Sequence, residues 1–164
     1  MMDSPLTKAI ALALLVGNDC WYIHLYAKGD KFDQLHKMTE EYYHWMSSQS
    51  DTLMEMGMEF GVMPNNPSLV LQSMPDYAPE VDVEYSWETA LVVLKDKISL
   101  YISALQELRE YTTFSDVQST LDEWIRAWSK EVNYKLDRRS EDRSSMLNGF
   151  VNTGLDNALA YRMG

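Results

Sequence analysis

Cysteine is almost absent from this chain, because Cys20 is the only one among 164 residues. A single thiol excludes a disulfide within the chain and is typical of a reducing, cytoplasmic compartment. Long apolar runs are missing too: residues 9–16 form a run of eight, whereas a membrane-spanning helix needs about 20. The residues before this run carry only Lys8 against Asp3, unlike a signal peptide. We therefore expect a buried helix and no membrane contact.

Glycine and proline are scarce and unevenly placed. The chain has seven glycines and five prolines, and every proline except Pro5 lies between residues 64 and 79. This distribution favours long uninterrupted helices on either side of one irregular segment. The hydrophobic fraction of 46% argues for one folded domain with a substantial core.

Positive charge is also in short supply, with 14 Lys and Arg against 25 Asp and Glu and a net charge of −11. Between residues 76 and 88 there is no lysine or arginine, but there are five acids: Asp76, Glu80, Asp82, Glu84 and Glu88. Such a surface repels nucleic-acid phosphates and attracts cations. The stretch is either a solvated acidic face or a surface that guides cations, and composition does not decide between the two.

Apolar residues recur at helical spacing in four long segments. The expected helices cover residues 5–26, 31–60, 86–111 and 115 to about 140. Several end signals support these bounds. They are an N-cap at Ser4 before Pro5, glycine stops at Gly29 and Gly61, a cap for the second helix at Asp30, and a capping box formed by Ser115 and Gln118.

A long link joins the second and third helices. It covers residues 62–85, and residues 67–74 within it are expected to form a short helix. A link of this length can run the full length of a bundle, so the predicted fold is an all-α, ferritin-like four-helix bundle with a long crossover. We assign residues 1–140 to this bundle and residues 141–164 to a C-terminal extension. Its apolar side chains favour docking over a free tail: Leu147, Phe150, Val151, Leu155, Leu159 and Tyr161.

Four side chains have the chemistry of a ligand set for an iron-type ion: His24, His36, Asp51 and Glu55. Asp51 and Glu55 are four residues apart and share one helix face. His36 precedes Asp51 by fifteen residues, so on one straight helix they are about 22 Å apart at a rise of ~1.5 Å per residue. Either these residues form no site, or two antiparallel chains each supply half of one.

A second motif competes with this set. Glu41 and His44 have the Glu-x-x-His spacing of ordinary di-iron bundles. Such sites need a second copy of the motif on another helix, and neither His24 nor His36 has a Glu three residues before it. His44 is therefore interpreted as a structural residue.

The stretch from His24 to His36, HLYAKGDKFDQLH, resembles the signature of Dps, the ferritin-like DNA-protecting proteins of starved cells. In that family a His is followed by Gly five residues later, by Phe after three more, and then by Leu-His. An acidic pair, a Tyr and an Asp-x-x-x-Glu follow, matched here by Glu40 with Glu41, Tyr43, and Asp51 with Glu55. The resemblance covers about residues 5–140, with the helices in the same order.

The resemblance implies a ferroxidase centre at a two-fold interface, where His24 and His36 of one subunit face Asp51 and Glu55 of its mate. It also implies a homo-oligomeric, hollow shell of twelve subunits. By the same resemblance, we expect Fe(II) to be oxidised at this centre by hydrogen peroxide or oxygen and stored as ferric oxide, with Zn as an alternative occupant of the site. Glu40, one turn beyond His36, is either a further iron ligand or an exposed acid. The nearby aromatic residues are more typical of core or interface than of acceptors of oxidising equivalents: Trp21, Tyr22, Tyr26, Tyr43 and Trp45.

The sequence departs from the family in three places. The first seven residues carry no positive side chain, and the arginines of the C-terminal tail alternate with acids, so DNA binding is expected to be weak or absent. Leu25 follows His24 where many members have Trp. The candidates for the acids that line the family's iron-entry pore are Asp116, Asp122 and Glu123, and Lys130 lies further along the same helix.

Two rival functions remain from the sequence. One is a non-catalytic helical assembly protein that keeps the fold and its interface. The other is a DNA-compacting protein without oxidase activity, which the net charge of −11 argues against.

Overall fold

The computed structural model describes residues 4–62, 65–80 and 84–139, and most of this part of the chain is helical. Its elements in chain order are α1 (Pro5–Tyr26), α2 (Phe32–Glu59), α3 (Pro67–Gln72), α4 (Trp87–Tyr111), α5 (Ser115–Lys130), the π-helix η1 (Glu131–Leu136) and α6 (Asp137–Arg139). The predicted extension at 141–164, with its apolar residues, lies outside the described residues.

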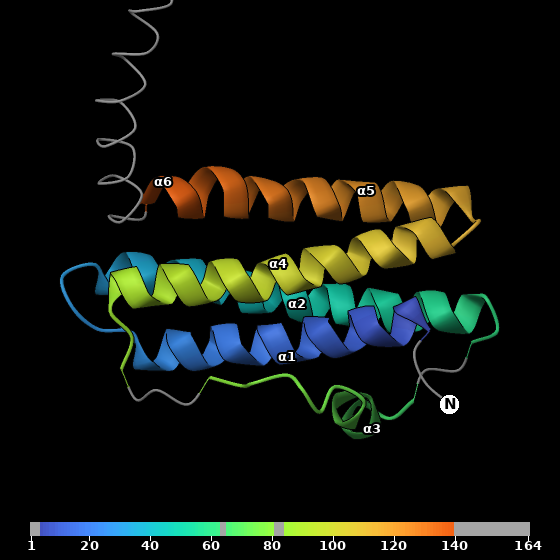
Figure 1. The fold of residues 1–164 in the computed structure, drawn as a ribbon, viewed down its shortest axis with the longest axis horizontal. Helices are drawn as coiled ribbons and strands as arrows, with labels where there is room; N and C mark the ends of the chain where they lie inside the picture. The colour runs from blue at the N-terminus through green and yellow to red at the C-terminus, as the bar shows by residue number, and fades with distance from the viewer. Residues whose placement is uncertain (1–3, 63–64, 81–83, 140–164) are drawn as a thin grey trace, which may run out of the picture.

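Four long helices, α1, α2, α4 and α5, lie side by side, and η1 and α6 continue the line of α5 (Figure 1). Neighbours α1 and α2 are antiparallel, as are α4 and α5. The crossover carries the chain back along α1, where α3 packs, so that α2 and α4 run in the same direction (Figure 1). The predicted ferritin-like bundle with a short helix in its long crossover is confirmed.

Most of the predicted helix ends are also found. Ser4 is the N-cap of α1, and its side chain accepts a hydrogen bond from the Thr7 amide at 3.2 Å, with Pro5 as the first helical residue. Gly29 and Gly61 have φ angles of +97° and +76°, a region that only glycine enters without strain. These two residues therefore end α1 and α2 as predicted, within a few positions.

The predicted capping box at the start of the fourth helix is wrong. Phe114 is the N-cap of α5 without a side-chain bond, and Ser115 is already helical. The Gln118 side chain instead donates from Nε2 to the carbonyl of Thr112 at 2.7 Å, and Thr112 is the C-cap of α4. Because the last carbonyls of a helix have no partner within it, Gln118 completes the end of the preceding helix instead.

Asp30 does not cap α2 either. The N-cap is Lys31, with no side-chain hydrogen bond, and the amide of Phe32 donates to the carbonyl of Gly29 at 3.0 Å. The backbone turn at Gly29 thus satisfies the donor that an Asp30 cap would serve. The π-helical turn η1, which interrupts the last predicted helix, was not expected either.

The core forms where α1 packs against α2 and α4. Gly17 on α1 allows this close approach, because a Cβ atom there would lie 2.9 Å from Cβ of Met46 on α2. Cys20 is fully buried in the same core, and burial raises the pKa of its thiol well above the ordinary value. The cysteine therefore acts as a small apolar side chain rather than as a reactive thiolate.

A buried polar cluster ties the crossover to the bundle. The carboxylate of Asp19, 2% exposed, accepts hydrogen bonds from the Tyr77 hydroxyl and, at 3.1 Å, from the Glu80 amide. Lys97 of α4 lies 3.4 Å from Asp19 and 3.5 Å from Glu80, and it also donates to the carbonyl of Ala78. One ammonium group thus neutralises two acids and fixes the path of the crossover.

This cluster changes the interpretation of the acidic stretch between residues 76 and 88. Glu80 is paired with Lys97, and Glu84 forms an ion pair with Lys28. Asp76 and Glu88 remain exposed, while Asp82 lies outside the described residues. Two of the five acids therefore hold the crossover in place, which favours a structural face over a cation-guiding surface.

Helix α1 (Pro5–Tyr26) extends well beyond its apolar run at residues 9–16. Although its apolar run has eight residues, the whole helix of 22 residues is long and apolar enough to cross a membrane. Most of that segment is nevertheless buried within the bundle, where its apolar side chains form the core.

Candidate metal centre

His24 and His36 meet where α1 ends and α2 begins. Their rings stack with centroids 3.6 Å apart and planes inclined by 23°. His24 is 8% exposed, and His36 is partly buried. The tight turn at Gly29 brings the two helices back together and so places the two imidazoles in contact.

Each histidine is held by the backbone of the other. Nδ1 of His24 donates to the carbonyl of His36 at 2.9 Å, and Nδ1 of His36 donates to the carbonyl of His24 at 3.0 Å. A carbonyl oxygen only accepts, so the proton of each neutral ring is on Nδ1. This leaves the lone pair of Nε2 on both rings for a metal ion, with the ring orientation already set.

Three neighbours hold this pair in place. The ring of Phe32 stacks on His36 at 5.1 Å, and the ring of Tyr43 meets His24 edge-on at 5.3 Å. The hydroxyl of Thr39 donates to the carbonyl of His36 at 3.1 Å, beside its bond to Leu35. The imidazoles are therefore fixed by stacking and hydrogen bonds before any ligand arrives.

The predicted carboxylates do not reach this pair within one chain. Asp51 and Glu55 are exposed on α2 and belong to the same helix as His36. At ~1.5 Å per residue, the fifteen residues between His36 and Asp51 place them about 22 Å apart. Across residues 4–62, 65–80 and 84–139, no group of three or more His, Cys, Asp or Glu side chains is close enough to share a metal ion.

The other sequence candidates are also separate from the histidine pair. Glu40, Glu41 and His44 are all exposed on α2. The ring of His44 contacts that of Tyr43 at 4.4 Å, and in the described part of the chain Glu41 and His44 gain no further ligand. Glu40 lies one turn after His36 and stays a prediction as an additional iron ligand.

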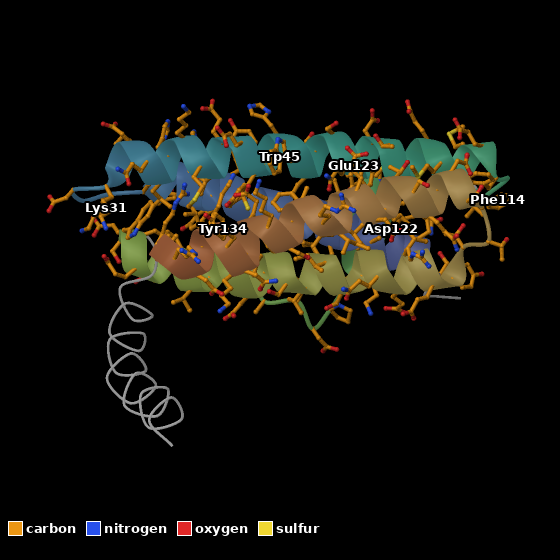
Figure 2. All side chains as sticks on the ribbon, turned by 90° about the horizontal axis from the view of Figure 1, so that it is seen from above. Lys31, Trp45, Phe114, Asp122, Glu123 and Tyr134 are labelled. Carbon is orange, nitrogen blue, oxygen red and sulfur yellow. The ribbon has the colours of Figure 1, made fainter. Side chains whose placement is uncertain are left out.

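The three acids considered for a pore differ in their surroundings. Arg109 contacts Asp122 through Nε at 2.9 Å and Nη2 at 3.3 Å, and this hydrogen bonding lowers the pKa of the Asp122 carboxyl. Figure 2 shows Asp122 on the α4 side of α5, whereas Glu123 lies on the α2 side near Trp45. Asp116 is exposed near the start of α5. Asp122 is thus already paired with an arginine, which leaves it less suited to attract a cation.

Apolar side chains surround the histidine pair on the surface. Trp21 and Leu25, four residues apart on α1, are 49% and 53% exposed, and Phe32 at the start of α2 is 40% exposed. A cluster of large exposed apolar residues beside polar ligands is typical of an interaction surface.

Sequence reasoning missed a second cluster in the core. The hydroxyl of Tyr42 on α2 donates to the carboxylate of Glu131 on η1 at 2.8 Å, and Glu131 is 5% exposed. Burial, and then the charge of Glu131, raise the pKa of Tyr42. The two residues are 89 positions apart, and Glu131 follows Lys130 in a charged segment. No local pattern in the sequence indicates that this acid is buried.

No family model matches this chain, and no curated protein sequence matches it. Solved structures match most of it. Antigen TpF1 from Treponema pallidum has a TM-score of 0.76 and 18% identity, covering 84% of this chain and 89% of its own. A Dps protein from Bacillus brevis has a TM-score of 0.71 and 20% identity, and the match covers 82% of this chain and 91% of that one.

A third structure, Dps from Vibrio cholerae O1, is described as a member of a broad superfamily of ferritin-like diiron-carboxylate proteins. It has a TM-score of 0.70 and 18% identity, and the match covers 82% of this chain and 85% of that one. At these identities the similarity shows the fold. This chain has the four-helix bundle fold of Dps proteins, as the resemblance in the sequence predicted.

Proposed function

We propose that this protein is a ferroxidase that assembles with copies of itself, oxidises Fe(II) and stores the Fe(III) product. The observation that carries the proposal is the stacked pair of His24 and His36, whose Nδ1 protons are donated to carbonyls while both Nε2 lone pairs remain. Two oriented neutral imidazoles are ligands for Fe(II). Oxidation to Fe(III) needs carboxylates to stabilise the higher charge, and Asp51 with Glu55 would supply them.

The geometry of α2 favours a partner subunit as the source of the carboxylates. In an antiparallel pair of α2 helices, the position opposite His36 is Asp51 when the two-fold axis passes between residues 43 and 44, since (36 + 51)/2 is 43.5. For Glu55 to lie opposite His36, the axis must pass between residues 45 and 46, at the midpoint of 45.5. Both values fall near the middle of α2 (Phe32–Glu59), so the same dimer brings both acids toward the histidines. A two-fold interface then contains two identical sites.

The surface around the histidines supports the same dimer. The exposed apolar residues Trp21, Leu25 and Phe32 would become buried against the partner. Burial of apolar surface is the main favourable term in such an association. A hollow shell of twelve subunits, a cytoplasmic location and hydrogen peroxide or oxygen as oxidant belong to the same proposal. Zinc, which binds imidazole and carboxylate ligands, would compete with iron at the site.

A complementation experiment tests whether two chains share the site. We would prepare His36→Ala and Glu55→Ala separately, expecting slow Fe(II) oxidation in each after anaerobic loading and peroxide addition. Subunits are then mixed after dissociation and reassembly. In a mixed dimer one site carries both substitutions and the other is intact, so a 1:1 mixture should regain about a quarter of the wild-type sites.

Three outcomes separate the functions. Recovery in the mixture supports the shared ferroxidase site, whereas two inactive variants that stay inactive when mixed would contradict it. A wild-type assembly that takes up no iron would instead favour the non-catalytic assembly protein. A gel shift with intact assemblies at physiological salt tests DNA compaction, and with a net charge of −11 we expect no shift.

A further inference from the structure

Four aromatic rings from α2, α4 and α5 are in contact inside the bundle. Trp128 is at their centre, with ring centroids 5.2 Å from Trp45, 5.5 Å from Tyr42 and 6.2 Å from Tyr101. Trp45 lies 6.3 Å from Tyr42 and is 38% exposed, whereas Trp128, Tyr42 and Tyr101 are almost fully buried. The cluster therefore connects the surface with the core through rings in direct contact.

Trp45 reaches the surface away from the histidine pair. It lies nine residues after His36 on α2, and at ~100° per residue the two side chains project from opposite faces of the helix. Figure 2 shows Trp45 on α2 beside α5, close to Glu123. Trp45 thus connects the cluster to a part of the surface that is separate from the histidine pair.

The two tyrosines of the cluster differ in the group that accepts their hydroxyl proton. Tyr42 donates to a carboxylate oxygen of Glu131 at 2.8 Å, and Lys135 holds the other oxygen at 2.5 Å. Tyr101 donates at 3.0 Å to the amide oxygen of Gln49, which also accepts from Trp128 at 2.9 Å. A carboxylate takes up a proton readily, whereas an amide oxygen is a very weak base. Of these two tyrosines, Tyr42 alone therefore has a base in place for its phenolic proton.

We propose that Tyr42 and Glu131 form a redox-active pair, which a one-electron oxidant at the surface reaches through Trp45 and Trp128. The oxidant takes one electron from Trp45. Tyr42 then transfers an electron to the oxidised Trp45, directly or through Trp128. The phenolic proton of Tyr42 moves to the carboxylate of Glu131. The products are a neutral tyrosyl radical, a protonated Glu131 and an oxidant reduced by one electron, so charge and protons balance.

The oxidation of Tyr42 is favoured because its electron and its proton are transferred together. A tyrosine that loses an electron becomes a strong acid, and a buried radical cation is costly because the low dielectric disfavours new charge. Moving the proton 2.8 Å to Glu131 avoids that charge on the ring. Tyr101 has no such proton acceptor, so the radical should form on Tyr42. This proposal does not depend on the ferroxidase function, because the oxidant can be supplied externally.

The test uses the intact protein with a flash-excited ruthenium tris-bipyridine complex and persulfate as electron acceptor, which together provide a one-electron oxidant. Freeze-quenched samples are examined by electron paramagnetic resonance. We expect a neutral tyrosyl signal in the wild type and its loss in Tyr42→Phe. The matched control, Tyr101→Phe, removes a buried hydroxyl from the same cluster and should leave the signal unchanged.

Two further measurements keep the result independent of folding defects. Glu131→Gln retains Tyr42 but removes the base, so the signal should change from tyrosyl to tryptophan radical. In the wild type, electron–nuclear double resonance should detect an exchangeable proton on Glu131 that is hydrogen-bonded to the tyrosyl oxygen, and its signal should disappear in D2O. A tyrosyl signal that persists in folded Tyr42→Phe, or that is lost equally in Tyr101→Phe, would overturn the proposal.

Discussion

His24 and His36 each donate the Nδ1 proton to the main-chain carbonyl of the other, at 2.9 and 3.0 Å, while their rings stack at 3.6 Å. This reciprocal arrangement sets the tautomer of both rings, and the rings of Phe32 and Tyr43 help to fix their orientation. It needs two helices that end and begin within a few residues of each other, which the turn at Gly29 provides.

We expect His36→Ala to slow Fe(II) oxidation by at least about tenfold, because loss of an oriented imidazole removes a ligand from the proposed site. Oligomeric mass should not change, since the proposed interface would bury mainly apolar side chains such as Trp21, Leu25 and Phe32. Stopped-flow absorbance and native mass spectrometry measure the two quantities. Asp96→Ala, which removes an exposed acid from α4 instead of α2, is the control and should oxidise iron at the wild-type rate. Dissociation of the His36→Ala assembly would show that the residue is mainly structural.

Gly17→Ala should lower the free energy of unfolding by about 1–3 kcal/mol, as expected for overpacking in a core. The added Cβ would lie 2.9 Å from Cβ of Met46, so α1 and α2 must separate. Asn18→Ala, at the next and exposed position, is the control and should be neutral or slightly stabilising, because alanine favours helix. Urea titration followed by circular dichroism measures both. Equal stability of Gly17→Ala and wild type would mean that the two helices adjust freely.

Lys97→Met should destabilise the protein by about 3–5 kcal/mol, because it leaves the buried Asp19 carboxylate without its cation. The crossover should also become more sensitive to proteases near Ala78, whose carbonyl loses the lysine hydrogen bond. Lys8→Met is the control: Lys8 pairs with Glu107 at the surface, where such a pair contributes roughly 0–1 kcal/mol. Chemical denaturation and timed proteolysis followed by mass spectrometry distinguish the two variants. Similar losses in both would contradict the buried role of Lys97.

Stability should fall as the solution becomes alkaline. Burial, and then the hydrogen bond to Asp19, raise the pKa of Tyr77 in the folded state. A raised folded pKa means that this contribution to stability is full below the unfolded pKa of about 10 and is lost as the pH rises beyond it, since only the unfolded chain releases the proton.

Tyr77→Phe tests this dependence through its slope. The variant is expected to be less stable at neutral pH, because Asp19 loses a hydrogen-bond donor. It should nevertheless lose stability less steeply between pH 9 and about 11 than the wild type. Tyr134→Phe, which changes an exposed tyrosine, should keep the wild-type slope in urea titrations across this range. A wild-type slope in Tyr77→Phe would exclude Tyr77 as a contributor.

Local patterns were sufficient for the helices and most of their ends. The apolar spacing predicted four long helices, and Ser4, Pro5, Gly29 and Gly61 act on the backbone within a few residues, so their effects are visible in the sequence. The two predicted caps, Asp30 and Ser115, do not form. The Gly29 carbonyl serves the start of α2, and Gln118 turns back to the end of α4. A capping pattern indicates only what a side chain can bind, not what competes with it.

The sequence by itself determined that the chain folds as a ferritin-like bundle, that two imidazoles lie near one turn, and that one straight helix keeps Asp51 away from them. These properties follow from periodicity and from a fixed rise per residue. Only the tertiary structure decided the carbonyl partners of the histidines, the burial of Asp19 with Lys97, and the contact of Tyr42 with Glu131. Such contacts join residues far apart in the chain, where burial depends on how whole helices pack and a charged residue has no local feature that marks it as buried.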